Sequence, residues 1–240
     1  MRPPVSARFE ELDWQPTPMG DLTLRRRRDD SLDVEIFEVK LGDEFLMSSL
    51  FTVAEEELAR LGLAALPADR EPLEVLVGGL GLGYTAIAAL RDPRVGTMTV
   101  IDTMPAVIDW HERGLLPVSG VLMGDPRTRL VLDDFFAVMR AAPSPADVRY
   151  DAILLDVDHS PRHQLDPSHA DLYTPSGLEA VAGHLAEGGV FALWSDDPPD
   201  DEFIAHAASA FSQVHAHVVD FDNPLTGGRS SNTVYVATRR

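Results

Sequence analysis

The chain has 240 residues, 45% of them hydrophobic, and its 39 acidic and 20 basic residues give a formal net charge of −19. This length suits one large α/β domain with a small N-terminal extension. The acidic balance argues against DNA or RNA as a partner, because phosphate binding needs a basic face, and the absence of cysteine excludes disulfides and thiolate metal sites.

The N-terminal part, residues 1–66, has β character and one helix. Residues Leu22–Leu24, Val34–Val39 and Glu44–Leu50 alternate or run apolar, and a helical pattern follows over Val53–Leu63. Strands of this kind must be covered or paired, so we predict a homodimer formed through this segment. No apolar run reaches membrane-spanning length and residues 1–8 lack the apolar stretch of a secretion signal, so we expect a cytoplasmic protein with no membrane partner.

Residues 67–240 alternate strand and helix signals, which predicts an α/β domain with a doubly wound parallel sheet. The last two apolar runs have only a turn-rich loop between them, so the sheet should be mostly parallel and close with a C-terminal antiparallel hairpin. The expected strands are Val75–Val77, Met98–Ile101, Leu130–Leu132, Ala152–Leu155, Val190–Trp194, Ala216–Phe221 and Thr233–Ala237. The expected helices are Thr85–Leu90, Pro105–Arg113, Phe135–Arg140, Pro175–His184 and Asp201–Phe211.

The first of these strands breaks into alternating glycines, Gly79, Gly81 and Gly83, and the second ends in Asp102. Glycines let the backbone turn sharply and approach a ligand, and an acid at the end of the next strand can accept both ribose hydroxyls. The GxGxG spacing also suits NAD or FAD, and such glycines can serve strand–helix packing alone. Because no Lys or Arg stands near to meet a diphosphate and GxxxxGK[ST] is absent, S-adenosylmethionine fits better.

Each expected parallel strand ends in a polar group. Ligands of such sheets lie beyond the carboxyl ends of the strands, at the switch point in strand order. The acids at these ends are Asp102, Asp133, Asp134, Asp156, Asp196 and Asp197. Their convergence predicts one ligand site at this edge; the plainer alternatives are solvated strand ends and helix caps.

With these residues placed, the chain resembles the spermidine synthase-like branch of the class I S-adenosylmethionine-dependent methyltransferase fold, from about Phe37 to the C-terminus. Asp102–Ile108 is similar to the acid-x-x-Pro-x-Val-Ile segment whose acid holds the ribose. By the same resemblance, Asp134 meets the adenine amino group, and Asp156, which ends a Tyr-Asp-x-Ile-x-x-Asp segment, faces the amine acceptor. The family also points to a dimer.

Three departures from the family pattern bear on the reaction. Leu82 stands where the polyamine synthases place the Asp that holds the amine of decarboxylated S-adenosylmethionine. Asp156-Val157-Asp158-His159 replaces Asp-Ser-x-Asp, and Val53-Ala54-Glu55 lacks the aromatic and amide residues of the acceptor-holding helix. We therefore favour methyl transfer to a small amine-bearing or cationic acceptor. Aminopropyl transfer from the decarboxylated cofactor is the alternative, and a non-catalytic adenosyl-binding homologue is a further one.

The candidate site residues fall into three groups. The cofactor group comprises Gly79, Gly81, Gly83, Asp102, Asp133 and Asp134. The catalytic candidates are Asp156, Asp158 and His159, since carboxylates attract a protonated amine and a neutral imidazole accepts a proton near pH 7. Trp194, Asp196 and Asp197 are candidates for an acceptor wall that holds a cation. The histidines and acids around His159 lack metal-ligand spacing, so we expect no metal site.

Overall fold

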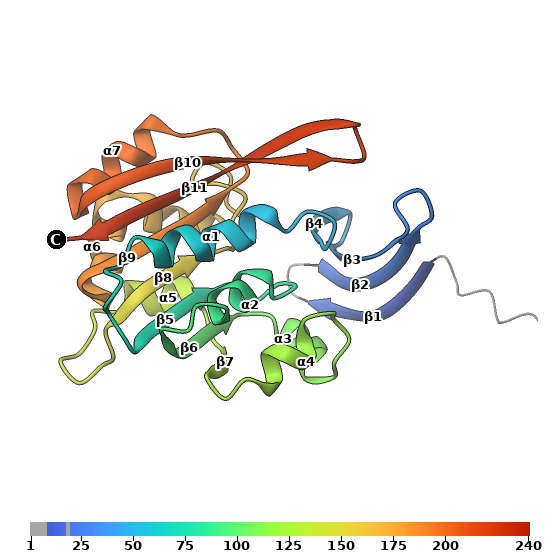
Figure 1. Ribbon diagram of the computed structural model, residues 1–240, viewed down its shortest axis with the longest axis horizontal. Helices are drawn as coiled ribbons and strands as arrows, with labels where there is room; N and C mark the ends of the chain where they lie inside the picture. The colour runs from blue at the N-terminus through green and yellow to red at the C-terminus, as the bar shows by residue number, and fades with distance from the viewer. Residues whose placement is uncertain (1–8, 18–19) are drawn as a thin grey trace, which may run out of the picture.

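A computed structural model describes residues 9–17 and 20–240. Four antiparallel strands form an N-terminal sheet in the order β1-β2-β3-β4, which stands beyond one end of the α/β part (Figure 1). The strands are β1 (Phe9–Thr17), β2 (Gly20–Asp29), β3 (Val34–Leu41) and β4 (Glu44–Ser48). Strand β1 was not predicted from the sequence, because most of its side chains are exposed and its apolar pattern is weak.

The larger sheet has seven strands in the order β10-β11-β9-β8-β5-β6-β7. The five strands from β9 to β7 are parallel, whereas β11 runs antiparallel to both β9 and β10. This arrangement confirms the predicted doubly wound sheet with a C-terminal hairpin. The strands are β5 (Leu73–Gly78), β6 (Val95–Asp102), β7 (Thr128–Leu132), β8 (Tyr150–Leu155), β9 (Leu185–Ser195), β10 (Phe211–Asn223) and β11 (Gly228–Arg239).

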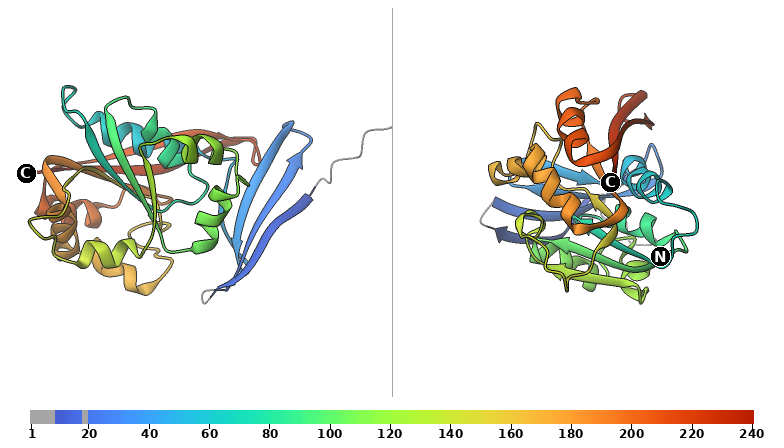
Figure 2. Two further views of the ribbon diagram at one scale, coloured as in Figure 1. Left: turned by 90° about the horizontal axis from the view of Figure 1, so that it is seen from below. Right: turned by 90° about the vertical axis from the view of Figure 1, so that its left-hand side faces the viewer.

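Helices cover both faces of this sheet (Figure 2). Alternate side chains of β5 lie on opposite faces of the sheet. Val75 and Val77 belong to one buried cluster, and Leu76 belongs to the other. The first cluster includes side chains of α1 (Val53–Ala64), α2 (Tyr84–Leu90), α3 (Pro105–Glu112) and α4 (Ser119–Gly124). The second includes side chains of α5 (Phe135–Arg140), the 3-10 helix η1 (Pro167–Tyr173), α6 (Pro175–His184) and α7 (Asp201–Ala210).

Helix α1 packs on the large sheet, although the sequence placed it with the N-terminal segment. A side chain at Gly62 would meet Leu154 of β8 at 2.8 Å and Ala192 of β9 at 3.1 Å. Helices α4 and η1 were not predicted from the sequence. No helix in the part of the chain that the structure describes is long and apolar enough to cross a membrane.

The strand order reverses between β5 and β8, so the crevice for a ligand opens where these two strands end. The chain leaves β5 at Gly79 and leaves β8 at Asp156, whose amide donates to the Gly78 carbonyl at 2.8 Å. The N-terminal sheet reaches this crevice through β4: a Cβ atom on Gly81 would lie 3.1 Å from Sδ of Met47. The small sheet thereby forms one wall of the site.

Candidate active site

The glycine turn lies against the end of β8. Gly79, Gly81 and Gly83 all have positive φ values, 91°, 47° and 89°. A Cβ atom on Gly79 would lie 2.1 Å from the carbonyl oxygen of Asp156, so no other residue fits there without moving the backbone. This geometry brings the turn and Asp156 together at the crevice.

Asp102 ends β6 beside this turn, and the backbone holds its carboxylate. Oδ2 accepts a hydrogen bond from the Leu80 amide at 2.9 Å, and Oδ1 accepts one from the Met104 amide at 2.8 Å. Burial raises the pKa of Asp102, and these backbone donors oppose the rise. These hydrogen bonds thus hold the carboxylate in place beside the glycine turn.

Of the two acids that follow β7, only Asp134 reaches a cavity. It caps α5, with Oδ1 accepting from the amides of Phe136 at 2.9 Å and Ala137 at 3.2 Å. Asp133 is exposed, and its Oδ1 accepts from the Asp134 amide at 2.8 Å. Asp133 therefore supports the turn before α5 and lines neither cavity described below.

Two adjoining cavities occupy the crevice. The first, which we name the glycine-turn cavity, has a volume of about 260 Å³ and is lined by Gly79, Gly81, Asp102, Asp134 and apolar side chains that include Ile101, Met104, Val107 and Phe136. The second, the acid-pair cavity, measures about 420 Å³. Leu46, Met47, Gly81 and Asp156 line both, so a ligand in one borders a ligand in the other.

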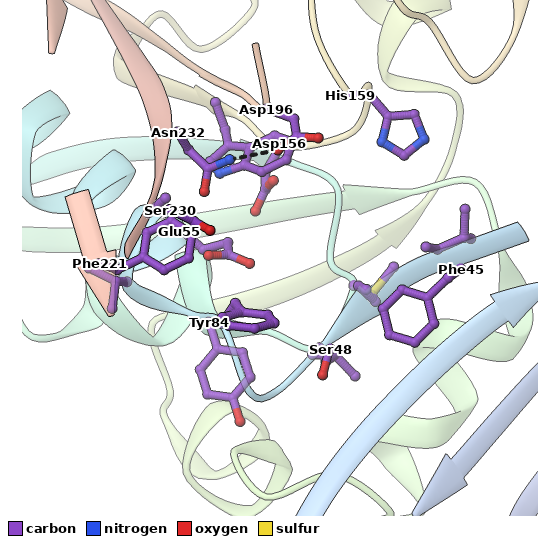
Figure 3. A pocket seen from close by; sticks show the side chains of 18 of the residues that line it. Phe45, Ser48, Glu55, Tyr84, Asp156, His159, Asp196, Phe221, Ser230 and Asn232 are labelled. Atoms are coloured by element: carbon purple, nitrogen blue, oxygen red, sulfur yellow. Dashed lines mark hydrogen bonds between the residues drawn. The ribbon is translucent and has the colours of Figure 1, made fainter. Parts of the chain in front are cut away.

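Two carboxyl groups from distant parts of the chain share the acid-pair cavity (Figure 3). Asp156 ends β8, and Glu55 lies in the first turn of α1. The Thr85 hydroxyl donates to Oδ2 of Asp156 at 2.7 Å. Burial raises the pKa of Asp156 to about 6, whereas burial together with the charge of Asp156 raises the pKa of Glu55 to about 8.

Glu55 was not among the site residues predicted from the sequence. It stood in the segment Val53-Ala54-Glu55 that departs from the family pattern, and an acid in a first helical turn is also common without any function. Its position beside Asp156 depends on how α1 packs on the sheet. The aligned family segment was the one signal in the sequence that pointed to it.

The remaining acceptor-side candidates differ in their positions. His159, Trp194 and Asp196 line the acid-pair cavity together with Leu82, Tyr84 and Phe221. Nε2 of His159 lies 3.2 Å from Oε1 of Glu44 on β4, at the rim between the two sheets. Oδ1 of Asp196 accepts from Asn232 at 2.8 Å.

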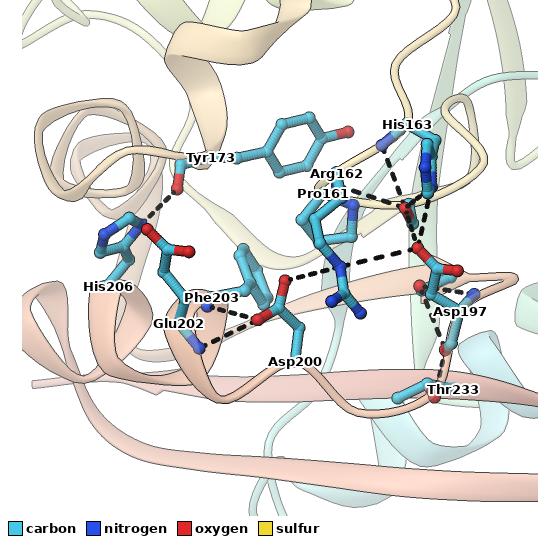
Figure 4. Close-up of polar contacts among 12 residues, drawn as sticks. Pro161, Arg162, His163, Tyr173, Asp197, Asp200, Glu202, Phe203, His206 and Thr233 are labelled. Carbon is cyan, nitrogen blue, oxygen red and sulfur yellow. Dashed lines mark hydrogen bonds and ion pairs between the residues drawn. The ribbon is translucent and has the colours of Figure 1, made fainter.

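Asp158 and Asp197 line neither cavity. Asp158 is buried, and both of its carboxylate oxygens accept hydrogen bonds from the segment Leu165–Tyr173. Asp197 accepts from Ser160 at 2.6 Å and lies 3.0 Å from Nδ1 of His163, in a polar cluster with Arg162 (Figure 4). A single residue, Val157, thus separates an acid in the cavity, Asp156, from an acid outside it, Asp158.

The described part of the chain gathers no group of three or more His, Asp or Glu side chains that could hold a metal ion. His159 and His163 face different partners, Glu44 and Asp197.

Comparison with known proteins places these features in a family. The spermine/spermidine synthase domain matches residues 52–222. Putrescine N-methyltransferase 2 of Nicotiana tabacum is 33% identical over 135 residues, which are 56% of this chain and 35% of the relative. A polyamine aminopropyltransferase of Mycobacterium tuberculosis is 28% identical over 155 residues, covering 61% of this chain and 29% of the relative. The chain thus spans about a third of the length of these relatives.

Solved structures agree on the fold. Spermidine synthase from Thermotoga maritima has a TM-score of 0.72 at 18% identity and covers 96% of this chain and 73% of its own. Human methyltransferase-like protein 13, solved with SAH, has a TM-score of 0.53 at 19% identity and covers 79% of each chain. The small N-terminal sheet and the seven-stranded sheet are thus matched together in the first of these structures.

Proposed function

Because the chain belongs to the spermine/spermidine synthase family, we propose that it transfers a methyl group from S-adenosylmethionine to a small amine-bearing or cationic acceptor. The observation that carries the proposal is the half-buried pair Glu55 and Asp156, in a cavity that adjoins that of the glycine turn and Asp102. The names of the plant relatives, which describe methyl transfer to putrescine, support the same reading.

The glycine-turn cavity has the chemistry that an adenosyl group requires. Asp102 can accept the ribose hydroxyls, and the apolar side chains of Ile101, Met104 and Phe136 offer surfaces for a purine. No Lys or Arg lines this cavity within the described residues, so the diphosphate of NAD or FAD would meet acids instead of cations. When bound, S-adenosylmethionine would supply an electrophilic methyl group at its sulfonium.

The acid pair can hold an amine and take its proton. An alkyl amine is protonated in water, so it must first be attracted and then deprotonated before its nitrogen can act as a nucleophile. Asp156, the member of the pair with the lower pKa, provides the attraction, and Glu55 lines the same cavity. Because Oδ2 of Asp156 already accepts the Thr85 hydroxyl, Oδ1 is the oxygen that we assign to the amine proton. Trp194, Tyr84 and Phe221 surround this space with aromatic surface, which excludes water and favours a cation.

The lining of the cavity favours methyl over aminopropyl transfer. Leu82, an apolar side chain, lines the acid-pair cavity at the position where, by the family resemblance, the polyamine synthases carry the Asp that holds the amine of the aminopropyl arm. Losing such a charged hydrogen bond costs about 1–3 kcal/mol. Aminopropyl transfer remains the second candidate, supported by the mycobacterial relative; it would require Asp196 to hold that amine in place of the missing acid.

Mass spectrometry of reaction products tests the proposal. The protein is incubated with a panel of diamines and monoamines, once with S-adenosylmethionine and once with its decarboxylated form. We expect an acceptor that gains one methyl group, and only with S-adenosylmethionine. An aminopropyl product on a diamine would establish the second candidate instead.

A binding measurement accompanies the product analysis. Titration calorimetry with S-adenosylmethionine, its decarboxylated form and NAD should show binding of the adenosyl sulfonium compounds. Preference for NAD would overturn the cofactor assignment. Tight adenosyl binding without any product from the panel would support a non-catalytic homologue.

A further inference from the structure

A buried histidine lies behind the glycine turn. His111 stands on α3, is 1% exposed and lines neither of the two cavities. Its Nε2 lies 3.0 Å from the Gly81 carbonyl oxygen, and a Cβ atom on Gly83 would lie 2.8 Å from its Cε1. The ring therefore packs against two of the three glycines of the turn, on the side away from the cavities.

The surroundings of His111 determine which ring nitrogen carries the hydrogen. A carbonyl oxygen only accepts, so Nε2 carries the hydrogen that is directed at Gly81. Burial lowers the pKa of His111, which keeps the ring neutral near pH 7 and leaves Nδ1 as an acceptor. The buried Ser119 hydroxyl lies 3.3 Å from Nδ1 and can donate to it. Both ring nitrogens thus have partners, which hold the ring in place behind the turn.

The hydrogen bond from His111 sets the direction of the peptide group that joins Gly81 to Leu82. In a trans peptide the C=O and N–H bonds point in opposite directions. The Gly81 carbonyl points at His111, so the Leu82 amide points to the other side of the turn. On that side a Cβ atom on Gly81 would lie 3.1 Å from Sδ of Met47, and both residues line the two cavities.

The Leu82 amide is an open donor at this junction. The two amides before it, those of Leu80 and Gly81, donate to the Asp102 carboxylate. The Leu82 amide donates to no group among residues 9–17 and 20–240. A backbone N–H in a crevice calls for an acceptor, which is either water or a ligand. The amide can therefore serve a ligand that extends from the glycine-turn cavity into the acid-pair cavity.

We infer that His111 is a positioning residue for the cofactor, which turns the Leu82 amide towards the carboxylate of the methionine tail. This inference rests on the proposed binding of S-adenosylmethionine. A carboxylate accepts a charge-assisted hydrogen bond from a backbone N–H, whereas an ammonium group has no lone pair to accept one. The decarboxylated cofactor, whose tail ends in the amine alone, gains nothing from this donor. His111 thereby helps the site to select the intact cofactor.

Titration calorimetry of the full chain with three ligands tests this inference. S-adenosylhomocysteine carries the amine and the carboxylate, its decarboxylated form carries the amine alone, and 5′-methylthioadenosine lacks both. The wild type should prefer S-adenosylhomocysteine over the decarboxylated form by about 10-fold, the contribution of one charge-assisted hydrogen bond. His111→Phe should lose this preference, because S-adenosylhomocysteine binds more weakly while the affinities for the other two ligands stay unchanged.

A pair of amide variants tests the same hydrogen bond with smaller changes. His111→Gln keeps a donor at the position of Nε2 and should retain much of the preference. His111→Asn keeps a polar group only at the position of Nδ1, so it should lose the preference as His111→Phe does. If His111→Phe does not fold, the comparison of these two variants carries the test.

The matched control is His184→Phe. His184 is 7% exposed, its Nε2 lies 2.9 Å from the Ala141 carbonyl oxygen, and it lines neither cavity. This variant loses the same kind of hydrogen bond and should keep the preference of the wild type. The inference is overturned if the wild type shows no preference, or if His111→Phe keeps the preference or weakens all three ligands equally. A wild type that binds none of the three would instead overturn the proposed cofactor, and this inference with it.

Discussion

Glu55 and Asp156 are two carboxyl groups with different surroundings inside one cavity. Thr85 donates a hydrogen bond to Asp156, which favours the ionised form of that residue. Glu55 carries the higher pKa, about 8 against about 6, because the charge of Asp156 adds to its burial. Near pH 7 the pair therefore holds about one proton, mostly on Glu55, and Asp156 is the member that can accept a proton from an amine.

Replacing the proposed base should affect turnover and leave cofactor binding in place. We expect Asp156→Asn to lower kcat about 100-fold or more, the range typical of a lost general base, with cofactor affinity within a few-fold of wild type. In the wild type, kcat/KM should rise with pH through about 6, as Asp156 ionises. Asp220→Asn, at an exposed acid on β10, is the control for steady-state kinetics and calorimetry. If Asp156→Asn lost cofactor binding, Asp156 would instead be a residue that contacts the cofactor.

The acid pair should also make folding stability depend on pH. A carboxyl group whose folded-state pKa exceeds its unfolded value binds more protons in the folded state, so it costs stability as pH rises from about 4.5 to about 8. Glu55→Gln removes this cost, so the variant should gain stability over wild type at pH 9 relative to pH 5. Glu57→Gln on the same helix is the control, because Arg60 lowers the pKa of Glu57. Urea unfolding at the two pH values measures the effect, and an equal difference at both would contradict it.

Leu82 provides a direct test of cofactor choice. Leu82→Asp introduces a carboxylate into the acid-pair cavity, where it could hold the amine of an aminopropyl arm. We expect the affinity for decarboxylated S-adenosylmethionine to rise about 10-fold, which corresponds to one charged hydrogen bond. Leu82→Asn, of the same shape without the charge, serves as the control in calorimetry. Equal gains in both variants would show that charge plays no part.

At the scale of elements, the segment between β8 and α6 is organised by one buried acid. Asp158 accepts from the Leu165 amide, from His169 and from Tyr173, and so joins the beginning of this segment to η1. The sequence presented Asp158 as a catalytic candidate because it follows a strand at the ligand edge. The structure instead uses it inside the segment, where its oxygens are already occupied.

This structural role predicts a stability effect. Asp158→Ala leaves a buried hydroxyl, a backbone amide and an imidazole without their acceptor, so the free energy of unfolding should fall by about 3 kcal/mol. Asp166→Ala removes an exposed cap of η1 and should cost only about 1 kcal/mol. Chemical denaturation followed by circular dichroism measures both. If the Asp158→Ala variant kept the stability of the wild type but lost turnover, Asp158 would be a catalytic residue, as the sequence suggested.

At the scale of the whole molecule, β1 and β4 are the outer strands of the N-terminal sheet among the residues that the structure describes. Phe9 and Trp14 on β1 and Phe45 on β4 are 53%, 50% and 47% exposed. Outer strands with exposed aromatic side chains favour pairing with another chain. The homodimer expected from the sequence stays a prediction, and these edges are the surfaces through which we expect it.

Light scattering decides the oligomeric state. We expect a mass of twice the 26.2 kDa of one chain at micromolar concentration. Trp14→Asp, which places a charge on the β1 edge, should shift the mass towards the monomer, whereas Val218→Asp on β10, a comparably exposed side chain outside the N-terminal sheet, should not. A wild type that stays monomeric when concentrated would contradict the prediction.

The sequence by itself determined the order of the elements and the ligand edge of the sheet. Apolar periodicity and glycine placement are local properties, so the five parallel strands, the helices between them and the turn at Gly79 could be predicted from neighbouring residues. Strand β1, whose side chains are mostly exposed, carried too little local signal, and the helices α4 and η1 were also missed. Asp102, Asp134 and Asp156 were selected because an acid at a strand end lies at a known place in such a fold.

Tertiary structure alone decided which of these side chains share a cavity. Glu55 shares a cavity with Asp156 only because α1 packs across the sheet. No local sequence pattern encodes this packing. Asp156 and Asp158 lie two residues apart and look alike in sequence, yet one faces the acceptor space and the other holds His169. The physical reason is that burial and hydrogen-bond partners come from distant segments, and these partners determine whether a carboxylate is free to meet a ligand.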